Sequence, residues 1–226
     1  MRNEVTMTTN DQRPSLPMGE AIHFGWEIFK KETGFLLGVQ IAALLAEGVV
    51  ALGSSWMEKV GGFHEWAMSL AYFVVTMIIQ SGVIKIALKY RDREKVEFAN
   101  LFDSFNILPV FMVCSVIAAI AVGFGYLCLV IPGIILTVKF WFSGFAVIDE
   151  KRGPIDAIRR SYHLTNGYGL ELFLFGMLLF GVNLLGLLCL GIGLFVSLPV
   201  SYLATAHVYR FLNTRSPKSP PASAAS

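Results

Sequence analysis

Three polar side chains interrupt the long apolar runs of this chain and are the residues best placed to do chemistry inside a membrane. Glu47, Lys139 and Asn183 each stand among apolar residues. At a rise of about 1.5 Å per residue, all three fall about 10–12 Å from the same end of their predicted helices. An ionisable group at this depth is costly unless it is partnered. We therefore predict a polar layer in which Glu47 pairs with Lys139 and Asn183 satisfies a remaining hydrogen bond.

Gln40 and Gln80 form a second predicted polar layer, about 22 Å from that end by the same rule. Two interpretations of these layers remain open. They either lock the helices in register through a buried ion pair and an amide pair, or they line a pathway for ions or protons.

A third group of polar residues follows an apolar segment, where the composition turns to charge. The text DEKRGPIDAIRRS begins with two acids, passes through a Gly-Pro pair and ends with two arginines and a serine. Proline suits the first position of a helix, because its fixed φ is already helical. The candidate site residues of this motif are Asp149, Glu150, Gly153, Pro154, Arg159, Arg160 and Ser161.

The residue patterns of common catalytic and cofactor sites are missing from the sequence. There is no Gly-rich phosphate loop, HExxH motif or nucleophile elbow. The four histidines occupy different segments, and the three cysteines lie in apolar segments, where thiols act as small hydrophobes. We predict no catalytic residue, no metal site and no cofactor, and therefore a protein that is not an enzyme.

Composition places these residues in a membrane. Hydrophobic residues make up 55% of the 226 residues and charged residues 15%, whereas a soluble domain has about 25% charged residues. The charges gather between apolar runs, and about 20 apolar residues span a bilayer. We predict an all-α, polytopic membrane protein with six transmembrane helices, at about residues 33–55, 66–88, 107–130, 133–148, 170–190 and 192–212.

Each pair of predicted helices follows an amphipathic segment, which gives three parallel hairpin units. The amphipathic segments span residues 17–32, 96–105 and 154–165. Each carries an aromatic residue at a corresponding place, namely Trp26, Phe105 and Tyr162. Amphipathic helices of this kind suit the membrane interface. We predict that all three lie along the cytoplasmic surface, with these aromatic rings facing lipid or the helix bundle.

The distribution of basic residues predicts the orientation. Of the 18 lysines and arginines, all but Lys59 and Lys139 fall on one side if the amino terminus is inside. Because basic residues concentrate in cytoplasmic segments, we predict that both termini are cytoplasmic. The predicted organisation is a flexible tail over residues 1–16, a six-helix transmembrane domain over 17–212 and a disordered tail over 213–226.

The third unit resembles a known membrane domain. The text that carries the resemblance is IPGIIL, then FAVIDEKRGPIDAIRRSYHLTNG, then LGIGLFVSLPVSYLATAHVYR. It resembles the membrane domain found beside glycerophosphoryl diester phosphodiesterases, and related stand-alone bacterial inner-membrane proteins of uncharacterised function. The resemblance covers residues 131–210, and the first half fits in layout. It implies the fold and a bacterial inner (plasma) membrane location. It implies no activity, because the chemistry of the phosphodiesterase-linked members belongs to a separate soluble domain.

Two classes of function remain. The first is a non-enzymatic integral membrane protein with a scaffold, regulatory or envelope- and lipid-associated role, whose basic faces contact anionic headgroups. The alternative is a small transporter or channel subunit, although the predicted repeats are parallel and not inverted. The expected partners are the lipid bilayer and either a second copy or another membrane protein. Nucleic acid is not expected, because the net charge is only +2.

Overall fold

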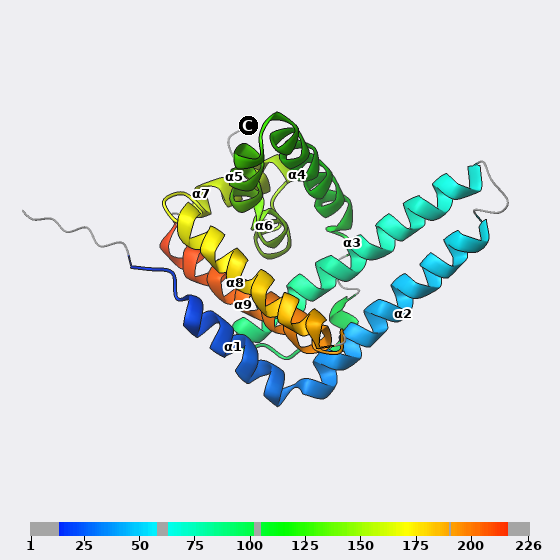
Figure 1. Ribbon diagram of the computed structural model, residues 1–226, viewed down its shortest axis with the longest axis horizontal. Coiled ribbons are helices and arrows are strands. Elements are labelled where there is room, and N and C mark those ends of the chain that lie inside the picture. The colour runs from blue at the N-terminus through cyan, green and yellow to red at the C-terminus, as the bar shows by residue number, and fades with distance from the viewer. Residues whose placement is uncertain (1–13, 58–62, 102–104, 190, 217–226) are drawn as a thin grey trace, which may run out of the picture.

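The computed structural model describes residues 14–57, 63–101, 105–189 and 191–216, and these residues are all-helical (Figure 1). The predicted all-α class is therefore confirmed. The helices are α1 Met18–Lys31, α2 Thr33–Met57, α3 Phe63–Arg91, the 3-10 helix η1 Phe98–Leu101, α4 Leu108–Cys128, α5 Val130–Phe140, α6 Ser143–Glu150, α7 Pro154–Leu164, α8 Gly169–Leu188 and α9 Leu194–Arg215.

Four helical stretches are long and apolar enough to cross a membrane: residues 66–91, 108–128, 130–150 and 169–188. The third of them consists of α5 and α6 together. A fifth is present if α1 and the start of α2 count as one span, although the two are bent by 93°. By length and composition, the described helices are therefore those of a membrane protein. The polar residues in the second half of α9, such as His207 and Arg210, lower its mean hydropathy.

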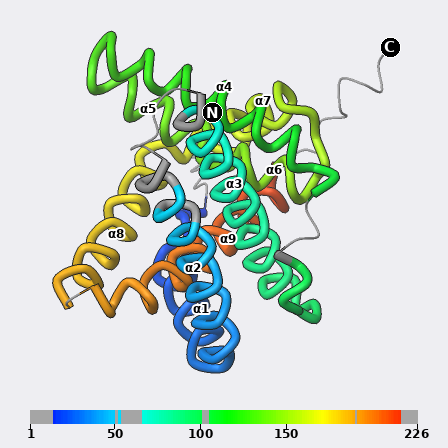
Figure 2. The backbone as a smooth tube through the Cα atoms, turned by 90° about the vertical axis from the view of Figure 1, so that its right-hand side faces the viewer, coloured from blue at the N-terminus to red at the C-terminus, as the bar shows by residue number. Residues whose placement is uncertain are grey.

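Three pairs of consecutive helices pack against one another: α2 with α3, α4 with α5 and α8 with α9. The distant halves of α2 and α3 project away from the other helices, at a steep angle to α8 and α9 in Figure 1. In Figures 1 and 2, α4 and α5 lie at the opposite side of the molecule from α1.

The core is built around α9. This helix packs against α1, α2, α3 and α8, and Val200, Leu203, Ala204 and Val208 are among its buried residues. It makes a close contact with α1, where a Cβ atom added to Gly25 would lie 2.6 Å from the backbone oxygen of Val200. Glycine is needed here because only a residue without a side chain lets the two backbones approach so closely.

The first and third amphipathic segments are α-helices, α1 and α7, as predicted. The second is not. Within residues 96–101 and Phe105, the described part of that segment, only η1 is helical. An isolated helix of this length is marginal, and the Asn100 side chain accepts the backbone N–H of Glu97 at 2.9 Å. The Phe98 ring packs instead on Phe35 of α2, at a centroid distance of 4.6 Å.

The three aromatic residues of these segments are all substantially exposed, as a lipid-facing side chain would be. The exposed fractions are 45% for Trp26, 54% for Phe105 and 49% for Tyr162. Their position at a membrane surface stays a prediction.

At both ends, the ordered part of the chain extends beyond the predicted bounds of 17–212. Leu16 was predicted to belong to a flexible tail, but its side chain is buried. Its backbone N–H donates to Glu171 of α8 at 2.5 Å. At the other end α9 continues to Arg215, and Asn213 and Ser216 are anchored by Arg160. Long-range polar contacts order both segments, and such contacts leave no local pattern in the sequence.

Candidate functional site

Charged side chains gather where α3, α6 and α9 end and α7 runs past them. We call this group the ionic cluster; its members are Asp92, Asp149, Glu150, Arg152, Arg160, Tyr209, Arg210 and Asn213. It brings together Asp149, Glu150 and Arg160, three residues of the predicted loop motif.

Arg160 is the centre of one half of the ionic cluster. Its side chain is 1% exposed, and its Nε donates to Glu150 Oε1 at 3.1 Å. The two terminal nitrogens donate to Asn213 Oδ1 at 2.5 Å and to Ser216 Oγ at 3.2 Å. The other oxygen of Glu150 accepts from Arg152. A buried guanidinium needs such a full set of acceptors, because desolvation of the charge is otherwise uncompensated.

Arg210 is the centre of the other half. Its NH1 donates to Asp149 Oδ2 at 2.6 Å, and its Nε donates to Asp92 Oδ1 at 2.9 Å. A second bond from the same guanidinium to Asp92 completes a bidentate pair, the geometry that arginine and carboxylate favour. The buried Tyr209 hydroxyl donates to Asp149 Oδ2 at 3.0 Å. One side chain of α9 therefore joins the ends of α3 and α6.

Gly153 and Pro154 bring the acids of α6 and the arginines of α7 together. The chain leaves α6 through Lys151, which has a left-handed φ of 49°. Gly153 is the N-cap of α7, and Pro154 occupies its first turn, where a missing N–H costs nothing. This tight turn sets α7 beside α6, so that Arg160 reaches back to Glu150.

Ser161 satisfies backbone groups that are left free at a break between two helices. The helices α5 and α6 are separated at Trp141 and Phe142. The Ser161 hydroxyl donates to the Lys139 carbonyl at 2.7 Å and accepts the Phe142 N–H at 3.1 Å. Backbone groups freed by a helix break must be satisfied inside a membrane. Arg159, next on α7, is exposed and has no ion pair among the described side chains.

The ionic cluster can hold helix ends together, and its charges balance. Its acids are Asp92, Asp149 and Glu150, and each is bonded to at least one of three arginines. A carboxylate whose oxygens already accept hydrogen bonds from a guanidinium is poorly placed to take a proton from a substrate. Elsewhere in the described part of the chain, no three His, Cys, Asp or Glu side chains gather where they could hold a metal ion.

The first predicted polar layer does not form as a unit, which corrects the sequence-based expectation. The Lys139 ammonium lies over the Tyr162 ring, 4.6 Å from its centroid, and among the described side chains it makes no ion pair with Glu47. Glu47 instead lies within electrostatic range of Tyr202 on α9. The long lysine stem lets its charge reach the polar helix α7, and depth along a helix says nothing about which direction a side chain takes.

Asn183 couples α8 to α9. Its Nδ2 donates to Ser201 Oγ at 2.9 Å and to the Leu179 carbonyl at 2.8 Å. The second predicted layer is also not a pair: Gln40 lines a small groove with Pro199, Gln80 is exposed, and the described atoms show no hydrogen bond between the two amides.

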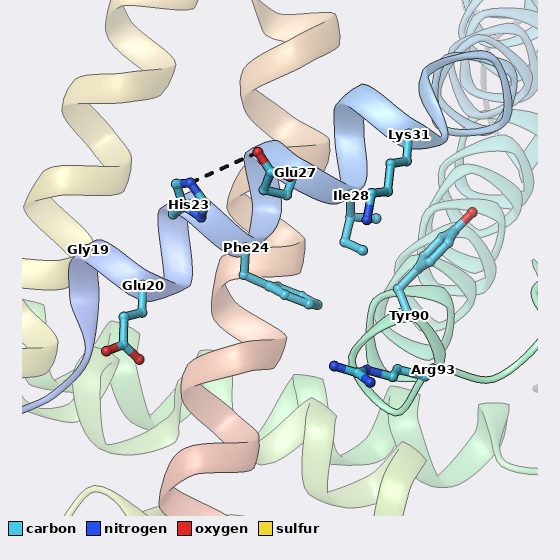
Figure 3. Close-up of a pocket in the computed structure, with 9 residues that line it drawn as sticks. All are labelled: Gly19, Glu20, His23, Phe24, Glu27, Ile28, Lys31, Tyr90 and Arg93. Carbon is cyan, nitrogen blue, oxygen red and sulfur yellow. Dashed lines mark ion pairs between the residues drawn. The ribbon is translucent and has the colours of Figure 1, made fainter.

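Two open hollows adjoin the ionic cluster and share Glu20 at their rims; together we call them the basic groove. The first, of about 870 Å³, lies between α1 and the end of α3 (Figure 3), and is lined by Gly19, Glu20, His23, Phe24, Glu27, Ile28, Lys31, Tyr90 and Arg93. The second, of about 510 Å³, is lined by Pro17, Glu20, Arg91, Asp92, His207, Arg210, Phe211, Thr214 and Arg215.

Residues 96–225 of the chain match the model of a family described as a domain of unknown function (DUF7847). The chain belongs to the DUF7847 family. It matches no curated protein and no solved structure. The part that matches DUF7847 contains α4 to α9 and every residue of the ionic cluster except Asp92. The helices α1, α2 and α3 precede it, and α1 and the end of α3 form one wall of the basic groove.

Sequence reasoning missed the α9 half of the cluster in this DUF7847 chain. Tyr209 and Asn213 are one helical turn apart, and Arg210 is beside them. The signal was present as polar residues at helical spacing near the end of an apolar helix. The count of lysines and arginines places Arg210 on the cytoplasmic side without naming a partner for it, and Asn213 falls at the start of the predicted tail.

Proposed function

We propose that this chain is a non-enzymatic protein of the bacterial inner (plasma) membrane with a scaffold, regulatory or lipid-associated role. The observation that carries the proposal is the closed ionic cluster, in which every acid is held by an arginine. Such a cluster suits a fixed arrangement of helices, because moving any one helix end would leave a buried charge without its partner. Its proposed partners are the bilayer and the anionic headgroups of the cytoplasmic surface.

The proposal includes six membrane spans, formed by α2, α3, α4, α5 with α6, α8 and α9, with both termini cytoplasmic. The gathering of the ends of α3, α6 and α9 in one cluster supports it, because these are the ends that the count of lysines and arginines assigns to the cytoplasm. Under this topology the three hairpins enter and leave on the same side, and α1 and α7 meet the cytoplasmic surface.

Cysteine labelling tests the topology. In a background without Cys114, Cys128 and Cys189, single cysteines at positions 55 and 62, in or near the α2–α3 turn, should react in intact cells with a thiol reagent that does not cross membranes. Cysteines at Glu94, which is exposed after α3, and at Gly153 should react only after the cells are opened. Labelling of Gly153 from outside would overturn the orientation.

Reconstitution tests the role. We expect purified protein in vesicles to leave proton and potassium permeability unchanged, and to be more resistant to thermal unfolding when the vesicles contain phosphatidylglycerol. The resemblance to the phosphodiesterase-linked membrane domain then describes a shared fold without a shared activity. Ion flux above that of empty vesicles would instead assign the chain to transporters or channels.

A further inference from the structure

Among the described side chains, the basic groove has an excess of positive charge. Lys31, Arg91, Arg93 and Arg215 line it, and none of the four forms an ion pair with a described side chain. Arg91 lies over the Phe24 ring at 5.7 Å, and its Nε is buried without a hydrogen-bond partner. Arg215 stacks on Phe211 at 4.0 Å. Both guanidinium groups are held by aromatic rings, which keep them in place without removing their charge.

The acids of the groove are mostly occupied. Asp92 is bonded to Arg210. Glu27 accepts from Lys30 at 2.6 Å and lies 4.0 Å from His23. That hydrogen bond and the charge of Lys30 lower the pKa of Glu27. Glu20 alone among the described acids that line the groove has neither a hydrogen bond nor an ion pair. Four free cations therefore face one free acid, so the groove is complementary to an anion.

The groove is also placed to meet a lipid headgroup. In Figure 3, Phe24 of α1 points towards Arg93, which lies beyond the end of α3, and Glu20, His23, Glu27 and Lys31 are spread along the same helix. Trp26 of the same helix is 45% exposed, and tryptophan favours the headgroup level of a bilayer. Phe24 and Ile28 add apolar area to the groove beside its charges, as a headgroup joined to acyl chains would require.

We propose that the basic groove binds one anionic phospholipid, with Arg91, Arg93 and Arg215 supplying the positive charge that attracts its phosphate. The proposal rests on the proposed function, because it needs this end of the molecule to lie at a membrane surface. Arginine is suited to phosphate, since its planar fork donates two parallel hydrogen bonds. The negative charge of Glu20 repels the phosphate and therefore lowers the affinity of the groove for the lipid.

The test is a lipid titration of the full-length protein in neutral detergent. The measured quantity at each lipid concentration is the midpoint temperature of thermal unfolding. Phosphatidylglycerol should raise the midpoint of the wild type in a concentration-dependent way. Arg93→Asn and Arg215→Gln should each weaken apparent binding about fivefold, the equivalent of about 1 kcal/mol per basic residue. Asparagine is chosen at Arg93 because the φ of 59° there suits it. Both arginines are exposed, so the variants should fold.

Glu20→Gln should strengthen phosphatidylglycerol binding several-fold, because it removes the opposing charge. Arg159→Gln is the matched control, since Arg159 is exposed on α7 and lines neither hollow; it should leave binding unchanged. If Arg159→Gln weakened phosphatidylglycerol binding as much as Arg93→Asn and Arg215→Gln do, binding would depend on the overall surface charge, and the proposed site would be wrong. Weaker binding in Glu20→Gln with a preference for phosphatidylethanolamine would overturn the choice of an anionic lipid.

A titration with soluble glycerol phosphate tests whether the ligand is a lipid or a free phosphate compound. If glycerol phosphate stabilised the protein as much as phosphatidylglycerol does, the lipid assignment would be wrong. If phosphatidylglycerol stabilises the wild type and binds equally well to Arg93→Asn and Arg215→Gln, the basic groove is not the binding site. That result would leave the proposed function intact. A wild type indifferent to phosphatidylglycerol would contradict the lipid-associated part of the proposed function as well.

Discussion

Arg160 shows how one buried charge can be made compatible with an apolar interior. It lies on the face of α7 that packs into the core, with buried Ala157, Ser161 and Leu164. Its nitrogens donate to Glu150, Asn213 and Ser216, so the side chain joins α6 to the end of α9. The net stability from such a group is small, since desolvation offsets much of the attraction, but loss of one partner is severe.

We expect Arg160→Met to lower the free energy of unfolding by about 3–5 kcal/mol, because Glu150 would keep a buried charge with one partner fewer. Denaturant unfolding in detergent measures the change. Arg159→Gln on the same helix is the control, and an exposed substitution of this kind should change stability by about 0.5 kcal/mol or less. Equal effects of the two substitutions would show that burial of Arg160 has no energetic consequence.

At the scale of the elements, α1 is a packed helix and more than a surface segment. It buries Ala21, Gly25 and Phe29, and it runs along α9, from Phe211 and Thr214 beside Pro17 to Val200 beside Gly25. The polar groove face and the exposed Trp26 occupy the rest of its circumference. An amphipathic pattern alone describes such a helix as interfacial, because it does not reveal which partner covers the apolar face.

Gly25→Ala should destabilise the protein by about 1–3 kcal/mol, the usual cost of overpacking a tight contact. The added Cβ would meet the backbone oxygen of Val200 at 2.6 Å, and a backbone atom cannot turn aside. Gly19→Ala is the matched control, since nothing lies within 4 Å of its Cβ position. Alanine should favour the helix there by up to about 1 kcal/mol. Thermal unfolding of the two variants should therefore shift in opposite directions, and a shift in the same direction would contradict the close α1–α9 contact.

At the scale of the whole molecule, Arg210 ties three distant parts of the chain together. It belongs to α9 and bonds to Asp92 after α3 and to Asp149 at the end of α6. The distant halves of α2 and α3 project from the bundle (Figure 1). The ends of α3, α6 and α9 at the ionic cluster therefore depend on one another.

Arg210→Met should cost about 1.5–3 kcal/mol, the range for hydrogen bonds to charged groups, and should increase protease cleavage in the stretch after Asp92. Adding Asp92→Asn should recover part of the loss, because one of the two carboxylates left facing each other becomes neutral. Arg215→Met is the control, since Arg215 is exposed, stacks on the Phe211 ring and forms no ion pair with a described side chain. The bridging role would be refuted by a double variant no more stable than Arg210→Met.

The sequence by itself determined the class of protein, the approximate bounds of the helices and the polar motif after α6. These follow from local physics: apolar runs of spanning length indicate α4 and α8, and Pro154 after Gly153 favours a helix start at α7. For the same reason Asp149, Glu150 and Arg160 could be singled out beforehand, since they are close in the chain. The six spans and their orientation, also read from local patterns, stay predictions.

Only the tertiary structure decided which distant groups meet. It set Lys139 over Tyr162, joined Asn183 to Ser201 and brought Asp92 to Arg210. Equal depth along two helices places residues at one level, but the rotation of each helix and the reach of each side chain choose the partner. Those rotations are set by packing around α9, including the close approach of Gly25 to Val200. Packing is a sum of contacts between residues far apart in the chain, and a sequence read in order does not display that sum.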